Sequence, residues 1–269
     1  MKSRIIILLF LFIYGCGNEN IPAGGNINPF ENFRYPFSDN INWFYKYNNI
    51  IHNIRPDSIR QYITTDTIKG TGISIWSGDT TINGVTGKIF RSEHNEPNHS
   101  HSTIELFVQT DSGLISTYSG NTGRSFGPFS ANLGNKFLFN GNIYESLNEI
   151  ITETNISQAY TAIKYPVNIG DEWFLQRLSG NFNFYKKYID VVNLSVPAGT
   201  FECIKIKKIV KNDSGVENNN YEYYDYLSVK GILKRDYNLK NIGFLNSQGE
   251  VIGYFDIKEE IEVNLISGF

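Results

Sequence analysis

Three of the four histidines of the chain gather in the segment SEHNEPNHSH. His94, His99 and His101 stand beside Glu93 and Glu96, and imidazole and carboxylate groups are common ligands of zinc. His99 and His101 are two residues apart, so their side chains would share one face of a strand. The segment is also rich in Asn, Pro and Ser, which is typical of a solvated loop. We expect a plain surface loop without metal, and a zinc site formed by these histidines is the alternative.

Ser125 lies in the segment GRSFG, which matches the Gly-x-Ser-x-Gly elbow that exposes the nucleophile of many hydrolases. Such an elbow leaves a strand, opens a helix, and has its histidine later in the chain. Here Pro128 follows the motif directly and all four histidines precede Ser125. The segment therefore favours a loop, and hydrolysis is retained only as an alternative function.

Two carboxylate pairs have the spacing of acid and base candidates: Asp171 with Glu172, and Glu222 with Asp225. Asp171 follows Gly170 in a predicted turn, where we expect its side chain to cap backbone N–H groups. Glu222 and Asp225 are three residues apart in a predicted strand, so they point to opposite faces. We expect no catalytic residues. The rings of YEYYDY could stack on a sugar, but cross-strand aromatic pairs are the commoner role for such a segment.

The beginning of the chain has the pattern of an export signal. Lys2 and Arg4 precede an apolar run from Ile5 to Tyr14. A helix needs about twenty apolar residues to cross a bilayer, so this run is too short to span one. It predicts a cleaved signal peptide over residues 1–15.

Cys16 is the predicted site of lipidation. The segment IYGC resembles the lipobox of bacterial lipoproteins, although Tyr14 departs from the small residue usual at its position. An ordinary cleaved signal or an uncleaved anchor is the alternative. The resemblance implies several acyl chains on Cys16, which together hold a protein stably in a membrane. Gly17 follows in place of the Asp that signals retention in the inner membrane, so the resemblance implies the outer membrane, with the body facing the periplasm or the cell surface.

Residues 16–34 are rich in Gly, Asn and Pro, and we predict a flexible tether that makes no contact with the core. The rest of the chain is rich enough in apolar and aromatic residues to build a large core, since the whole sequence is 41% hydrophobic and 14% aromatic. The net charge is −3 and no basic stripe is present, which argues against a nucleic-acid partner. Cys203 is the only other cysteine, and we expect it to be free and buried.

Alternation of apolar and polar residues predicts a mainly β protein with little helix. In TFECIKIKKIV, Ile204 and Ile206 fall on one face and Lys205 and Lys207 on the other, as in a half-solvated antiparallel strand. Four further segments have the same character: VTGKIFRSE, STIELFVQT, FNFYKKYIDVV and YEYYDYLSV. The best helix candidate is YESLNEIITETNIS, which would suit a strand as well.

The chain contains an internal echo. Tyr-Pro is followed by Trp-Phe after the same interval at Tyr35 and at Tyr165, and each copy leads to a Gly-containing turn and later to a glycine with two aliphatic residues. We therefore predict two tandem related units, residues 35–160 and 161–269, with Trp43 and Trp173 at equivalent places.

The second unit resembles a group of bacterial secreted and lipoprotein domains of unknown function. The matching segments are YPVNIGDEW, VPAGTFECIKIK and YYDYLSVKGILKRDY, and VPAGTF is the most specific. The resemblance implies curved antiparallel sheets related to the half-barrel of periplasmic lipoprotein carriers. The first unit has TINGVTGKIF in place of VPAGTF, so the resemblance extends to it less clearly.

These observations predict a lipoprotein of the outer membrane that acts as a binding or structural module without enzymatic activity. A carrier or sensor that holds an apolar ligand against a concave sheet is one alternative, and an envelope hydrolase is the other. No cofactor is expected, and the expected partners are the membrane and an unidentified ligand or envelope protein.

Overall fold

The computed structural model describes residues 30–63, 66–96, 99–122, 136–139, 142–144, 159–177 and 182–268. Among these residues the only helix is a short 3₁₀ turn, η1 (Asp57–Tyr62), and no helix is long and apolar enough to cross a membrane. The strands are β1 (Asn42–Arg55), β2 (Thr67–Ile82), β3 (Val85–Glu96), β4 (His99–Gln109), β5 (Gly113–Thr122), β6 (Phe137–Phe139), β7 (Asn142–Tyr144), β8 (Tyr160–Lys164), β9 (Glu172–Arg177), β10 (Phe182–Val196), β11 (Gly199–Asn212), β12 (Tyr221–Ser228), β13 (Gly231–Leu245) and β14 (Val251–Ser267).

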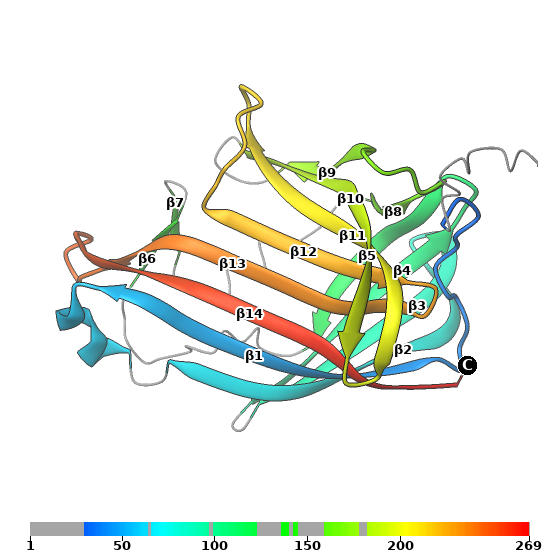
Figure 1. Cartoon of the computed structure of the whole chain (residues 1–269), viewed down its shortest axis with the longest axis horizontal. Coiled ribbons are helices and arrows are strands. Elements are labelled where there is room, and N and C mark those ends of the chain that lie inside the picture. The colour runs from blue at the N-terminus through cyan, green and yellow to red at the C-terminus, as the bar shows by residue number, and fades with distance from the viewer. Residues whose placement is uncertain are drawn as a thin grey trace, which may run out of the picture.

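The strands form one antiparallel sheet of fourteen strands, in the order β8-β5-β4-β3-β2-β1-β14-β13-β12-β11-β10-β9, with β6 and β7 off this path (Figure 1). The path consists of two six-stranded meanders, β1 to β5 with β8 and β9 to β14. They are joined by the pairing of β1 with β14. The predicted mainly β fold of curved antiparallel sheet is confirmed, and the two halves share one continuous sheet.

All five segments predicted as strands from their alternation are strands, namely β3, β4, β10, β11 and β12. The VPAGTF segment contains the tight turn between β10 and β11, where Val196 pairs with Gly199 and Gly199 has a φ of 136°. The helix candidate YESLNEIITETNIS lies outside the described residues apart from Tyr144, which ends β7.

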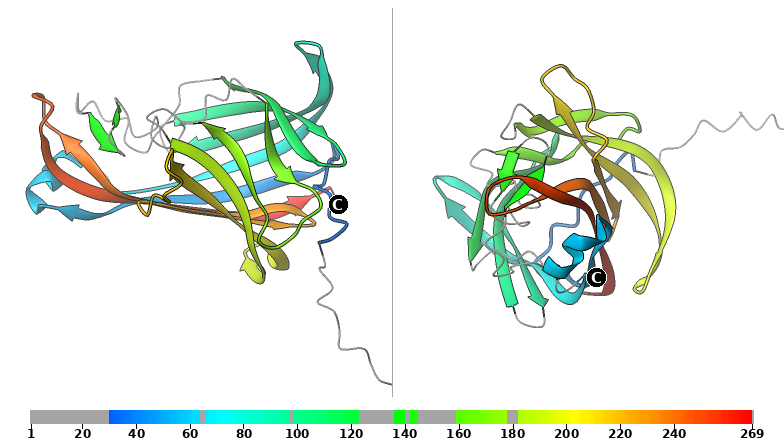
Figure 2. Two further views of the ribbon diagram at one scale, coloured as in Figure 1. Left: turned by 90° about the horizontal axis from the view of Figure 1, so that it is seen from above. Right: turned by 90° about the vertical axis from the view of Figure 1, so that its left-hand side faces the viewer.

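The sheet curls until its two terminal strands approach each other, which makes it nearly closed and barrel-like (Figure 2). Side chains bridge the seam between β8 and β9. Trp173 Nε1 donates to the carbonyl of Thr161 at 2.9 Å, and Lys186 Nζ donates to that of Ala162 at 2.9 Å. Tyr188 Oη donates to the carbonyl of Lys164 at 2.6 Å. These bonds occupy backbone carbonyls of an edge strand that would otherwise be unpaired.

The enclosed side of the sheet holds two main apolar clusters. The first contains all three tryptophans, and the second lies toward η1 and β6 and includes Leu239, Phe244 and Phe255. We call the side of the sheet that bears these clusters the inner face. Removal of these apolar side chains from water supplies the main driving force for folding.

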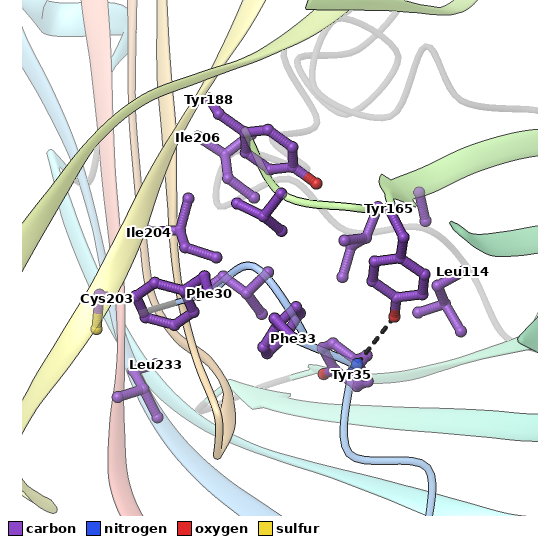
Figure 3. Close-up of a cluster of buried hydrophobic side chains, with 14 of the residues drawn as sticks. Phe30, Phe33, Tyr35, Leu114, Tyr165, Tyr188, Cys203, Ile204, Ile206 and Leu233 are labelled. Atoms are coloured by element: carbon purple, nitrogen blue, oxygen red, sulfur yellow. Dashed lines mark hydrogen bonds between the residues drawn. The ribbon is translucent and has the colours of Figure 1, made fainter. Parts of the chain in front are cut away.

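The segment before β1 corrects the predicted tether. Phe30 and Phe33 are 2% and 5% exposed and belong to the first apolar cluster, where they lie on the enclosed side of the sheet (Figure 3). The described end of the predicted tether, from Phe30 to Arg34, is therefore packed into the body. Two aromatic side chains in a polar segment bury enough apolar surface to hold it there. Residues 16–29 lie outside the described residues.

The two halves of the sheet share several local features. Trp43 and Trp173 are both buried, and each is the second residue of its strand, β1 or β9. Gly113 and Gly231 each begin the fifth strand of their meander. The duplication that the echo suggests stays a prediction, as do the boundaries of the two units.

Candidate functional site

A belt of charged side chains crosses the inner face between the apolar clusters. On each of four adjacent strands, one charged residue lies two positions from a residue of the first cluster and faces the same side. The charged residues are Lys186 on β10, Lys208 on β11, Asp225 on β12 and Arg235 on β13. We call these four residues, with Glu105 on β4, the charged belt.

The strand register brings the belt residues together. Lys186 lies directly opposite Lys208, and Asp225 lies directly opposite Arg235. On the far side of each charge, the same strands carry apolar or aromatic residues: Phe184, Val210, Tyr223 and Tyr237. On these four strands the charged residues therefore lie between apolar or aromatic residues on both sides.

The centre of the belt is the ion pair of Asp225 with Arg235. Arg235 Nε donates to Asp225 Oδ1 at 2.8 Å, and the Asp225 side chain is only 2% exposed. Burial alone would raise the pKa of Asp225, but the positive charges of Arg235 and Lys186 outweigh burial and lower it. The Arg235 side chain is 37% exposed although it lies on the inner face. Solvent therefore reaches this part of the interior.

Aromatic rings position the cations of the belt. Lys208 Nζ lies 4.3 Å from the ring centroid of Phe184 and 5.0 Å from that of Tyr223, and Arg235 Cζ lies 5.4 Å from Tyr223. Tyr221, Tyr223 and Tyr237 form a row of parallel rings with centroids about 6 Å apart. The cross-strand pairing of Tyr223 with Tyr237 confirms the structural role expected for YEYYDY. Lys208 and Arg235 both lie close to the ring of Tyr223.

Glu105 faces the belt from the other half of the sheet. Tyr160 Oη donates to Glu105 Oε1 at 3.0 Å. Burial raises the pKa of this carboxyl, and the hydroxyl and the cations Arg235 and Lys186 oppose the rise. Burial lowers the pKa of Lys186, and Asp225 and Glu105 oppose this effect. These couplings link charges that lie on both halves of the sheet.

The histidines lie in a hairpin rather than in the predicted surface loop. His94 is in β3, His99 and His101 are in β4, and the register places His94 directly opposite His101. The His94 ring lies 6.1 Å from that of Tyr47. Among the described residues, no group of three potential ligands could hold a metal.

The carboxylates considered for catalysis are separated from one another. Glu222 contacts Lys240 and is 44% exposed, whereas Asp225 is buried on the inner face, as their spacing predicted. Asp171 does not cap its turn as expected, because its carboxylate lies 2.9 Å from Lys164 Nζ. An ion pair with a nearby cation competes effectively with backbone N–H groups for an aspartate.

Of the residues Cys16, Cys203 and Ser125, the structure describes Cys203. Cys203 is free and buried, as predicted, and burial raises the pKa of its thiol to about 12. A thiol with so high a pKa is a poor nucleophile at neutral pH. Cys16 and Ser125 lie outside the described residues.

Sequence reasoning missed the charged belt. It placed Lys205 and Lys207 of β11 on the face opposite Ile204 and Ile206, as the structure does, and made no prediction for Lys208. Lys208 follows Lys207 directly, so one of the two must point inward. The adjacent Lys186 and Lys187 carry the same signal in β10.

Two solved structures are similar to this chain. One is a protein of Bacteroides fragilis NCTC 9343 described as exported and as having a YmcC-like fold, with 9% identity, coverage of 87% of this chain and 99% of that chain, and a TM-score of 0.33. The other is a protein of Parabacteroides distasonis ATCC 8503 described as a lipoprotein, with 11% identity, coverage of 87% and 97%, and a TM-score of 0.32. No protein-family model and no curated protein matches the sequence.

Proposed function

We propose that this protein is a lipoprotein of the bacterial outer membrane, anchored through Cys16, which binds a ligand on its inner face without enzymatic activity. The observation that carries the binding proposal is the solvent-reached charged belt, because buried charges are costly in a purely structural core. The export signal and the lipobox support the anchor.

A polar ligand has more support than the apolar ligand considered from the sequence. The apolar parts of the inner face are already packed with side chains, including Phe30 and Phe33 from the segment before β1. The hydrolase alternative has less support, since Glu222 and Asp225 lie apart and each contacts a cation of its own.

The anchor is tested by changing Cys16 to Ala in the full chain and washing the membranes with carbonate. We expect the variant to leave the membrane fraction and the wild type to stay. Cys203→Ala removes the other cysteine and should stay with the membrane. Recovery of the Cys16→Ala variant in the washed membranes would contradict a lipid anchor at this residue.

A further inference from the structure

The side of the sheet opposite the inner face, which we call the outer face, differs between the two halves. On the second half its charged side chains form ion pairs, such as Lys234 with Glu262 at 2.8 Å and Lys258 with Glu260 at 2.7 Å. An apolar inner face with a charged outer face is typical of an antiparallel sheet that has one side in water. The first half departs from this pattern near the start of β1.

Six apolar side chains form a continuous patch on the outer face there. Each lies one or three positions from an inner-face residue of its own strand, so it points to the opposite side. The register joins neighbouring strands, since Phe44 lies opposite both Leu265 and Ile73. We call this set the outer patch, and its members are Phe44, Ile73, Ile75, Ile89, Ile104 and Leu265.

Solvent reaches the outer patch. Leu265 is 53% exposed, and the other five side chains are partly exposed. None of the six belongs to either main apolar cluster. A contiguous apolar surface that faces solvent marks a contact with a membrane or with another protein.

The apolar character is confined to one end of the sheet. β1 begins and β14 ends at this end, where Asn42 pairs with both Ser267 and Ile75 (Figure 1). Farther along β1, β2 and β3, the outer face carries exposed charged residues, namely Lys46, Lys69 and Glu93. The outer patch is therefore a local surface beside the segment that leads into β1.

The length of chain before this segment indicates what covers the patch. Cys16 lies fourteen positions before Phe30, which packs into the body just ahead of β1. Fourteen residues span at most about 50 Å even when fully extended. A lipid on Cys16 therefore keeps the end of the sheet that bears the outer patch within reach of the bilayer.

Arg91 adds a cation to the patch. It lies on the outer face directly opposite both Ile75 and Ile104. An arginine in such a position can bury its stem among apolar side chains while its guanidinium group extends to a polar layer. Guanidinium groups match phosphates well, and apolar side chains beside cations suit the boundary between lipid headgroups and acyl chains.

We infer that the outer patch rests on the surface of the bilayer that holds Cys16, with its apolar side chains at the level of the headgroups and Arg91 toward the lipid phosphates. This inference rests on the proposed anchor at Cys16. It orients the body, with the first half of the sheet against the membrane and the ion-paired outer face of the second half in water.

The test places a fluorescent bimane label at Leu265→Cys or at Val216→Cys, in the full chain with Cys203→Ala. Val216 is the matched control, because it is an aliphatic residue that is 62% exposed and lies between β11 and β12 on the second half. Each lipidated protein is reconstituted in vesicles of phosphatidylethanolamine and phosphatidylglycerol that contain nitroxide-labelled lipid. Melting temperatures close to that of the unlabelled protein show that both variants are folded.

We expect the nitroxide lipid to quench the label at position 265 at least about threefold more strongly than the label at position 216, since an interfacial contact brings side chains to the level of the acyl chains. Equal quenching at the two positions would overturn the inference. Disulfide-linked dimers of unlabelled Leu265→Cys, without quenching of the labelled form, would also overturn it and would assign the patch to a second copy of the chain.

Flotation of the vesicles separates failure of this inference from failure of the anchor. If neither variant floats with the vesicles, the anchor at Cys16 is wrong and the inference falls with it. If both variants float and are quenched equally, the anchor stands and the inference alone is wrong.

Discussion

The hydroxyl of Tyr165 accepts a hydrogen bond from the backbone N–H of Tyr35 at 2.8 Å, so the two Tyr-Pro segments of the sequence touch in the folded protein. Tyr165 Oη also donates to Gln109 Oε1 at 3.2 Å, and its ring packs on Phe33. One side chain from the loop between β8 and β9 thus fixes the segment that leads into β1.

Changing Tyr165 to Phe should destabilise the protein by about 1 to 3 kcal/mol, because the buried N–H of Tyr35 loses its acceptor. Urea denaturation measures the loss, and amide exchange at Tyr35 should become faster. Tyr254→Phe removes a hydroxyl from a side chain that is 41% exposed and should have little effect. Equal stability of the two variants would show that the bond contributes nothing.

Two constraints favour glycine at position 231, its backbone conformation and the space available for a side chain. Comparison with Gly249 separates their effects on stability. It has a φ of 98°, and an added Cβ would lie 2.8 Å from Trp43 Nε1, which itself donates to the carbonyl of Lys230. Gly249 has a φ of 81° with open space around its Cβ position. Gly249→Ala should cost about 1 to 2 kcal/mol from the backbone alone. Gly231→Ala should cost about 1 to 3 kcal/mol more from overpacking, as measured by urea denaturation. Equal costs would mean that the indole moves freely.

Glu105 should make stability depend on pH. Burial raises its pKa above the ordinary value of 4.5, against the opposing effects of Tyr160, Arg235, Lys186 and Ser116. A raised pKa means that the folded state binds the proton more tightly, so the stabilisation is present below the ordinary pKa and is lost as the pH rises through the folded-state value.

The measurement for Glu105 compares wild type with Glu105→Gln between about pH 4 and pH 8. The wild type should lose free energy of unfolding relative to the variant as the pH rises. Glu202→Gln, at an exposed side chain of β11, is the charge-matched control. A difference that grows in favour of the wild type would contradict the prediction.

Trp43 and Trp173 belong to different halves of the sheet but to the same apolar cluster. The cluster and the pairing of β1 with β14 join the halves, so we expect the whole sheet to unfold in one transition. Trp43→Phe and Trp173→Phe should each lower the free energy of that unfolding by about 1 to 3 kcal/mol. Circular dichroism and the fluorescence of the remaining tryptophans should report the same midpoint. Two separate transitions would instead indicate that the halves unfold independently.

The histidine hairpin gives a prediction about metal. We expect a chelator to leave the melting temperature unchanged, because no group of three potential ligands among the described residues could hold a metal. Removal of a metal that binds the folded state would instead lower the melting temperature. A fall of several degrees that is absent from a variant with His94, His99 and His101 all changed to Ala would establish a metal site.

The strands could be predicted from local patterns, since the alternation of Ile204 and Ile206 with lysines depends only on neighbouring residues. The pairing of β1 with β14 could not, because it joins segments far apart in the chain and has no local signal. The burial of Phe30 and Phe33 was not predicted, because the surrounding Gly, Asn and Pro residues give the segment the composition of a flexible tether. The charged belt could not be predicted, because the local sequence does not indicate that the sheet encloses the side on which Lys186, Lys208 and Arg235 lie.

The closure of β1 by β14 sets an order of events during synthesis. β1 is made early, but its second neighbour is the last strand, Val251–Ser267. At roughly 5 to 20 residues per second, the ribosome needs on the order of ten seconds or more to deliver that neighbour. Throughout this interval β1 has one uncovered edge, and such an edge is a template for pairing with other chains. The pairing of β14 with β1 therefore also ends the exposure of this edge of β1 to other chains.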